Sequence, residues 1–276
     1  MIQAATPQEQ AVIHQLFDNI WQDYISLNPN VAKIHKELQA LEGTIINDHI
    51  ALRGFSKPGF GISRLAQPFI DLGYKKAGDY NFPQKKLIAI HLDPPAAGLP
   101  KVFISELKLE ECSQDVQDII HSITAQVEAS AFEDASFLYK GKQWGPISYQ
   151  VYQKLLDESE YAAWMYAFGF RANHFTVNVN QLSNFDSVDA INTWLKDKGY
   201  TLNVSGGEVK GGAEDKLAQS STMADKVAIE FVEGIRHLPS CFYEFAYRYP
   251  LANGELFGGF VPDSANKIFE STNAQG

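Results

Sequence analysis

The sequence predicts an α+β fold in which two similar strand-rich parts are joined by a helical segment. Three observations support this prediction. The hydrophobic pattern changes from helical to alternating near residue 44, returns to helical spacing over about 113–168, and alternates again from residue 170. A chain of 276 residues can bury one large core, so we expect a single domain over residues 1–276.

Two helices are expected in the N-terminal segment, residues 1–43. The run Thr6-Pro7-Gln8-Glu9 is typical of a capping box with proline at the first helical position. Apolar residues at helical spacing follow it, and Asn28-Pro29-Asn30 then interrupts the pattern. A second helix is predicted from there to a stop at Gly43.

The first strand-rich part spans residues 44–108. Strands are predicted over 45–55, 87–92 and 102–108, with a helix over 63–72 between the first two. A mostly helical insertion is expected over residues 109–168.

The second strand-rich part spans residues 169–250, and a tail of residues 251–276 follows. Its predicted elements are strands over 170–180, 227–232 and 240–247 and a helix over 187–198. The glycine-rich run Ser205–Gly212 lacks the Gly-Lys-Ser/Thr ending of a phosphate-binding loop, so a mobile hairpin or lid is expected there.

The two strand-rich parts resemble each other, which indicates an internal repeat. Each opens with a strand that carries a histidine, His49 in one and His174 in the other. Each continues into an amphipathic helix that ends in Gly-Tyr. Each closes with a strand that carries a glutamate, Glu106 in FISEL and Glu244 in CFYEF.

Strand alternation places the polar residues of each repeat on one face. His49 and Arg53 share a face of the first opening strand, and His174 lies on the polar face of the second. The opposite faces are apolar and are expected to pack on helices. Two curved sheets of this kind would form a cup with a polar inner face, onto which Glu244 also points.

Four motifs, DHIALRGF, FRANHFTVNVN, YEFAYR and GFVPDSANKIFEST, together resemble the 2-oxoadipate dioxygenase/decarboxylase family of the vicinal oxygen chelate superfamily. The resemblance covers about Thr44 to Thr272 and implies a pair of βαβββ repeats. It also implies an Fe(II) ion held by His49, His174 and Glu244, and an arginine, Arg53, that anchors a substrate carboxylate. The family reaction is oxidative decarboxylation of 2-oxoadipate to 2-hydroxyglutarate, so the implied partners are a small anionic 2-oxo acid and O₂.

The chemistry of the donor set supports this interpretation. Two imidazoles and one carboxylate on one face of Fe(II) leave positions for a chelating 2-oxo acid and for O₂. Glu106 is a further candidate, either as a fourth ligand or substrate contact or, more simply, as a cup-wall carboxylate or ion-pair partner. Gln219 and Ser221 follow the glycine-rich run and are candidates for substrate contacts.

Two other functions stay open from sequence alone. The same three ligands could hold Zn²⁺, Ni²⁺ or Mn²⁺ as a Lewis acid in a hydrolase or a glyoxalase/isomerase-type lyase. A metal-free small-molecule binding protein is the third possibility, but a pure binder has no need for two histidines and a glutamate that converge.

Charge and composition exclude several partners. A formal net charge of -10 argues against nucleic acid or an anionic membrane, and no apolar run approaches the roughly 20 residues of a membrane helix. The first ten residues show no signal-peptide pattern. The two cysteines, Cys112 and Cys241, form no disulfide framework, so a cytoplasmic protein with reduced thiols is expected.

Overall fold

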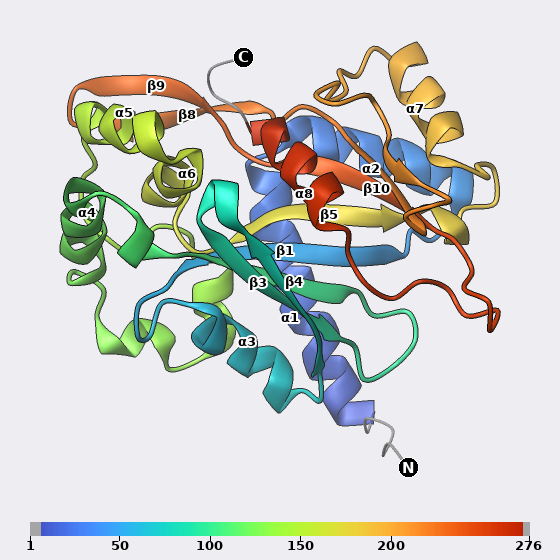
Figure 1. Cartoon of the computed structure of the whole chain (residues 1–276), viewed down its shortest axis with the longest axis horizontal. Coiled ribbons are helices and arrows are strands. Elements are labelled where there is room, and N and C mark those ends of the chain that lie inside the picture. Colours follow the sequence, from blue (N-terminus) through green and yellow to red (C-terminus); the bar gives the residue numbers. More distant parts are fainter. Residues whose placement is uncertain (1–6, 273–276) are drawn as a thin grey trace.

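The computed structural model describes residues 7–272 (Figure 1). Its first two elements are helices α1 (Pro7–Ser26) and α2 (Pro29–Glu42), which confirms the prediction for this segment. Thr6 of the predicted capping box lies outside the described residues. Asn28, between the helices, is buried, and its side-chain oxygen accepts a hydrogen bond from the backbone of Cys241, 3.1 Å away.

One eight-stranded sheet contains both predicted repeats. Its strand order is β2-β3-β4-β1-β5-β10-β7-β6, with β1 and β5 antiparallel at the centre. Each half therefore repeats one pattern, in which the opening strand lies beside and parallel to the closing strand: β1 with β4, and β5 with β10. The first half is formed by β1 (Asn47–Phe55), α3 (Ile62–Asp71), β2 (Lys75–Phe82), β3 (Leu87–Asp93) and β4 (Lys101–Leu107). The second half is formed by β5 (Ala172–Asn178), α7 (Val188–Asp197), β6 (Lys210–Gly212), β7 (Leu217–Ser221) and β10 (Phe242–Arg248). The predicted βαβββ pair is thus confirmed.

The hairpin predicted for the glycine-rich run is present, because after a turn at Gly206 and Gly207 its last residues form β6, which pairs antiparallel with β7 at the sheet edge. One other prediction in the second repeat needs correction. The predicted strand near 227–232 exists as β8 (Lys226–Phe231) but lies outside the main sheet. Within residues 7–272 its strand partner is β9 (Gly234–Pro239), with which it forms a separate hairpin.

The insertion between the repeats is mostly helical, as expected. It contains α4 (Gln114–Thr124), α5 (Tyr149–Glu158) and α6 (Glu160–Phe168). Short 3₁₀ helices lie between α4 and α5, whereas Ser159 alone separates α5 from α6. Helix α6 lies at one end of the sheet, where the Tyr161 hydroxyl accepts a hydrogen bond from the backbone nitrogen of Gly54. The β8–β9 hairpin passes beside α5 (Figure 1), and Phe231 of the hairpin packs on Tyr149.

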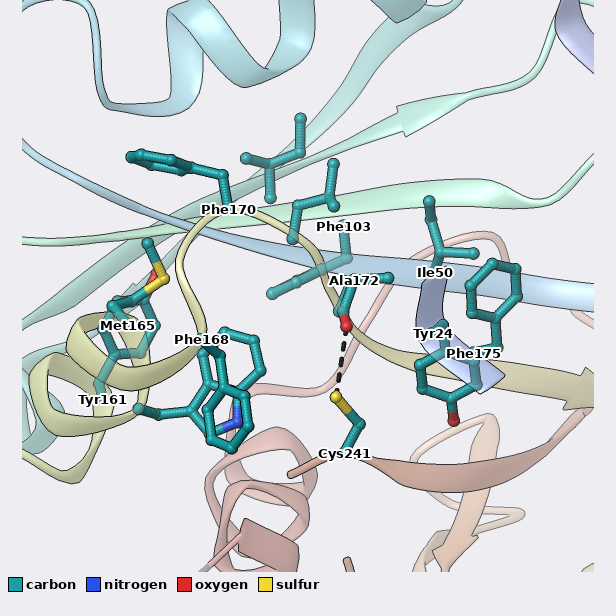
Figure 2. Close-up of a cluster of buried hydrophobic side chains, with 14 of the residues drawn as sticks. Tyr24, Ile50, Phe103, Tyr161, Met165, Phe168, Phe170, Ala172, Phe175 and Cys241 are labelled. Atoms are coloured by element: carbon teal, nitrogen blue, oxygen red, sulfur yellow. Dashed lines mark hydrogen bonds between the residues drawn. The ribbon is translucent and has the colours of Figure 1, made fainter. Parts of the chain in front are cut away.

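The apolar face of the sheet packs on helix α1, as the alternation predicts. Phe175 of β5 contacts Trp21 and Tyr24 of α1, each with ring centroids 4.9 Å apart. Figure 2 shows Tyr24, Phe175 and Ile50 together in this cluster, with Cys241 nearby, whose thiol points toward the carbonyl of Ala172. Because one face is filled in this way, the polar side chains of the same strands must lie on the other face.

The chain leaves the sheet after β10 and crosses back over the polar face. Its last described α-helix, α8 (Pro262–Ile268), lies in front of the sheet (Figure 1) and contacts β2, β6 and β7. Among the described residues, no helix combines the length and apolarity that crossing a bilayer requires.

Candidate metal centre

His49, His174 and Glu244 converge on the polar face near the middle of the sheet. They come from β1, β5 and β10, and their potential ligand atoms all lie within 4.8 Å of one another. The Glu244 carboxylate lies 3.5 Å from His49 Nε2 and 3.4 Å from His174 Nε2. All three residues are at most 5% exposed.

The strand register explains this convergence. His174 pairs with Ala51, which shares the His49 face of β1, while Glu244 pairs with Thr176, two residues beyond His174 on the same face of β5. Three neighbouring strands therefore present the donors side by side without any irregular loop.

Each imidazole is oriented by the side chain of the preceding residue, which contacts Nδ1, the ring nitrogen that faces away from the centre. His49 Nδ1 lies 2.7 Å from Asp48 Oδ1, and His174 Nδ1 lies 3.2 Å from Asn173 Oδ1. Burial would raise the pKa of Asp48, but the charge of Arg248 and the hydrogen bonds from His49 and Arg248 hold it well below its usual range. Since the ionised carboxylate only accepts, His49 carries its proton on Nδ1 and presents the lone pair of Nε2 to the centre.

The Glu244 carboxylate fits a bound cation. Gln219 Nε2 donates to its Oε1 over 2.6 Å, whereas its Oε2 is buried with no hydrogen-bond partner among the described residues. Burial raises the pKa of Glu244. Burial holds the pKa of His174 well below its usual range, and the charge of Arg53 lowers it further, so this imidazole is neutral, as a metal ligand must be. A buried oxygen without a partner beside two imidazole nitrogens is the arrangement that a divalent ion would complete.

A small cavity of about 20 Å³ adjoins the three donors. This is room for about one water molecule or one ion. Phe260 from the C-terminal tail covers it, with its ring centroid 4.8 Å from that of His49. The full lining is His49, Phe103, His174, Gln219, Glu244, Phe260 and Ile268.

Arg53 lies on the His49 face of β1 but does not line this cavity. It is 3% exposed, and its guanidinium lies 5.0 Å from the ring centroid of Tyr161 and 4.8 Å from that of Trp164, both in α6. It borders a separate cavity of about 200 Å³ together with Lys86 and Glu160. Arg53 thus lies close enough to the candidate centre for its charge to lower the pKa of His174. It borders the separate cavity of about 200 Å³, however, and not the cavity beside the three donors.

Glu106 is absent from the cup, which corrects its candidacy as a ligand or substrate contact. In β4 it alternates with Phe103 and Ser105 and points to the opposite face. Its Oε2 accepts a hydrogen bond from the backbone nitrogen of Ile62, the first residue of α3, over 2.7 Å. Its role is to cap that helix.

The two candidates after the glycine-rich run have different positions. Gln219 lines the cavity and binds Glu244. Ser221 pairs with Glu244 on the same face of the sheet but does not line the cavity. Its hydroxyl lies 2.7 Å from that of Ser271 in the tail, so it holds the tail.

Several residues at the site were missed at the level of sequence. Arg248 could have been found, because alternation along β10 puts it on the Glu244 face. Asp48 could also have been found as the neighbour of His49. Phe260 could not, because it follows no strand or helix period in the tail.

A family model described as 2-oxoadipate dioxygenase/decarboxylase matches residues 1–256 of this chain. The solved hydroxyglutarate synthase of Oryza sativa, in complex with 2-oxoadipate, is 32% identical, with a TM-score of 0.94 over 99% of this chain and 96% of that one. A Shewanella frigidimarina structure with only a general hydrolase assignment is 52% identical, with a TM-score of 0.86 over 91% of this chain and 98% of that one.

The fold is also that of a glyoxalase superfamily protein from Ralstonia eutropha. That structure is 21% identical, with a TM-score of 0.74 over 90% of this chain and 85% of that one. It supports the paired-repeat architecture alone, whereas the family match extends over nearly the whole sequence. The chain therefore belongs to the 2-oxoadipate dioxygenase/decarboxylase family.

Proposed function

We propose that this protein is a non-heme Fe(II)-dependent dioxygenase/decarboxylase that converts a 2-oxoadipate-like acid to a 2-hydroxyglutarate-like acid, with O₂ uptake and CO₂ release. The observation that carries the proposal is the convergence of His49, His174 and Glu244 within 4.8 Å in a member of this family. A relative 32% identical to the chain has been solved in complex with 2-oxoadipate, which supports the substrate class.

The ligands in this proposal are Nε2 of His49, Nε2 of His174 and the carboxylate of Glu244. An Fe(II) ion held by two imidazoles and one carboxylate supplies redox chemistry toward O₂ and free positions for a chelating 2-oxo acid. Zn²⁺, Ni²⁺ and Mn²⁺ suit similar donors, so the assignment of iron rests on the oxygen chemistry of the family.

Arg53 would bind a substrate carboxylate. Its guanidinium is rigid and always protonated, and it can form a forked pair with a carboxylate. It follows His49 by four residues on the same face, so the two side chains originate about 13 Å apart along β1. A dicarboxylic acid of moderate length can approach that span between a metal-bound end and a long arginine side chain.

The remaining walls would keep water from the reacting carbon. Phe103, Phe260 and Ile268 are apolar and line the cavity beside the donors. In a chain of net charge -10, an anionic substrate needs a dedicated cation, and Arg53 on the inner face meets that need. We also infer a cytoplasmic location, because Cys112 and Cys241 are both free thiols.

The test is anaerobic loading of chelator-stripped protein with Fe(II), followed by an oxygen-electrode screen of 2-oxo acids of different chain length. We expect O₂ uptake with 2-oxoadipate, matched by equal amounts of 2-hydroxyglutarate and CO₂. Protein loaded with Zn²⁺ serves as the control and should consume no O₂. Hydrolase or lyase turnover by the Zn²⁺ form, without O₂ uptake by the Fe(II) form on any 2-oxo acid, would replace this proposal by the Lewis-acid alternative.

A further inference from the structure

Arg248, the last residue of β10, joins two parts of the molecule that are distant in sequence. It is 4% exposed and lies on the same strand face as Glu244. Its Nε and Nη2 donate to Asp48 Oδ2 and Oδ1 over 2.7 and 2.8 Å, which is a forked pair. Its Nη1 donates to the backbone carbonyls of Phe257 and Gly259, each over 2.8 Å.

The first partner leads directly to the candidate centre. Asp48 Oδ1 also lies 2.7 Å from His49 Nδ1, so one carboxylate contacts both the arginine and the imidazole. The ring of His49 is thereby held with Nε2 toward His174 and Glu244. A carboxylate that orients a ligating histidine changes metal affinity when it is removed, commonly by about ten- to a hundredfold.

The second pair of partners leads to the roof of the same centre. Gly259 immediately precedes Phe260, whose ring covers His49 and lies 5.2 Å below the Arg248 guanidinium. The backbone nitrogen of Phe260 donates to the Tyr80 hydroxyl over 3.1 Å. A guanidinium that binds the carbonyls on both sides of Gly258 therefore fixes where the Phe260 ring lies.

We propose that Arg248 is a positioning residue that couples the ligand His49, through Asp48, to the roof segment Phe257–Phe260. The inference rests on the proposed metal centre but on no particular substrate. It has a definite consequence: binding of a metal and ordering of the roof must favour each other, and by linkage the effect is reciprocal. A purely structural ion pair has no such consequence, and a buried pair can often be replaced by apolar residues without loss of stability.

The test compares Zn²⁺ affinity and amide hydrogen exchange in the full-length protein. Zn²⁺ binding is measured by competition with a chromogenic chelator, and exchange of residues 257–260 is followed with and without Zn²⁺. In the unaltered protein we expect Zn²⁺ to slow exchange of this segment. In Arg248→Met we expect about ten- to a hundredfold weaker Zn²⁺ binding, faster exchange of the segment, and no further slowing by Zn²⁺. In Arg248→Lys, which keeps a charge near Asp48 but cannot reproduce the fork, we expect an intermediate result.

The matched control is Arg171→Met. Arg171 and Asp23 form another largely buried pair, 3.6 Å apart, that contacts none of the three candidate ligands. This variant should change thermal stability and leave Zn²⁺ affinity unchanged.

Three outcomes decide the matter. If Arg248→Met binds Zn²⁺ as tightly as the unaltered protein and keeps the slowed exchange, the coupling is wrong and the pair is structural. If Arg248→Met does not fold, the same comparison is made with Arg248→Lys, and an unchanged affinity there overturns the proposal. If the unaltered protein binds no Zn²⁺, the metal centre itself is rejected and the coupling with it.

Discussion

Phe103 of β4 occupies in the first repeat the place that Glu244 of β10 occupies in the second. His49 pairs with Lys101, and Phe103 lies two residues further along β4 on the same face. His174 pairs with Phe242, and Glu244 lies two residues further along β10 on the same face. The repeats therefore supply two equivalent histidines but only one carboxylate. The position equivalent to Glu244 in the first repeat, the fourth corner of the centre, is therefore filled by the ring of Phe103, which lines the cavity.

Restoring the missing carboxylate should remove oxygenase activity. In Phe103→Glu, a fourth protein ligand would fill a position that the 2-oxo acid or O₂ requires. We expect bound metal to be retained or increased while O₂ uptake with 2-oxoadipate falls at least about a hundredfold, roughly 2.7 kcal/mol in barrier. Phe103→Leu is the control for lost packing and should keep most activity. Equal turnover in both variants would show that this corner is not open to a ligand.

Removal of one histidine should abolish turnover and leave the fold. His174→Ala deletes a ligand from the polar face of β5 and little of the packing against α1, which involves Phe175 on the other face. We expect loss of bound iron and of O₂ uptake with a nearly unchanged melting temperature. Asn178→Ala, on the same face of β5, is the control that should keep iron. Full turnover of His174→Ala with iron bound would disprove its role as a ligand.

Glu106 should matter for stability alone. Its carboxylate accepts from the first backbone nitrogen of α3, and loss of a helix cap costs about 0.5–2 kcal/mol. Glu106→Ala is thus expected to lower the free energy of unfolding in urea by that amount and to leave iron content and KM unchanged. A change in iron content at unchanged stability would show that Glu106 contributes to the metal site.

Glu106 also shows which features of the site the sequence predicts and which it does not. Alternation identified the faces of β1 and β5 correctly, because each strand has one apolar and one polar side. The predicted match of Glu106 to Glu244 between the repeats is wrong by three positions, since the strand register matches Phe103 to Glu244. A shift of an odd number of residues along a strand exchanges its two faces. The predicted match therefore placed Glu106, which caps α3, on the inner face of the cup.

Other parts of the fold gave no usable pattern. Strand β2 was missed because it lies at the sheet edge, and most of its residues are exposed or half-buried on both sides. Strand β6 is three residues long and includes two glycines. The roof over the centre depends on where the tail returns after β10, and Phe260 reaches His49 only through tertiary contacts.

Buried Lys210 should give the protein a measurable pH dependence. It lies in β6, 1% exposed, and burial lowers its pKa from 10.5 to about 8. The unfolded chain therefore binds more protons than the folded chain between about pH 8 and 10.5. In that window Lys210 makes the free energy of unfolding rise with pH. Below about pH 8 it adds nothing to the pH dependence of that free energy.

Lys210→Met removes that contribution. The free energy of unfolding of the variant, relative to the unaltered protein, should fall by about 2–3 kcal/mol between pH 7.5 and pH 10.5. Urea melts at the two pH values measure the difference. Lys216→Met, a lysine nearby in the chain that sits in the turn before β7, is the control for the loss of one lysine charge. A flat difference for Lys210→Met would mean that this ammonium is solvated in the folded protein.

Arg53 should determine substrate affinity and leave the metal untouched. Its guanidinium has no lone pair to give, so it cannot be a ligand. It lies 5.0 and 4.8 Å from the ring centroids of Tyr161 and Trp164, at the wall next to the centre. Both rings hold a planar guanidinium better than a compact ammonium. We therefore expect Arg53→Lys to raise KM for 2-oxoadipate about tenfold and Arg53→Ala by up to about a hundredfold, following roughly 1.4 kcal/mol per decade.

The substrate series makes this prediction specific. If Arg53 binds the carboxylate far from the metal, a monocarboxylic 2-oxo acid of equal length should already bind weakly to the unaltered enzyme and lose little more in Arg53→Ala. Iron content, measured on the same samples, should stay constant in all variants. Iron loss at unchanged KM, or an equal loss of affinity for both acids, would show instead that Arg53 holds α6 against the sheet and does not bind the substrate.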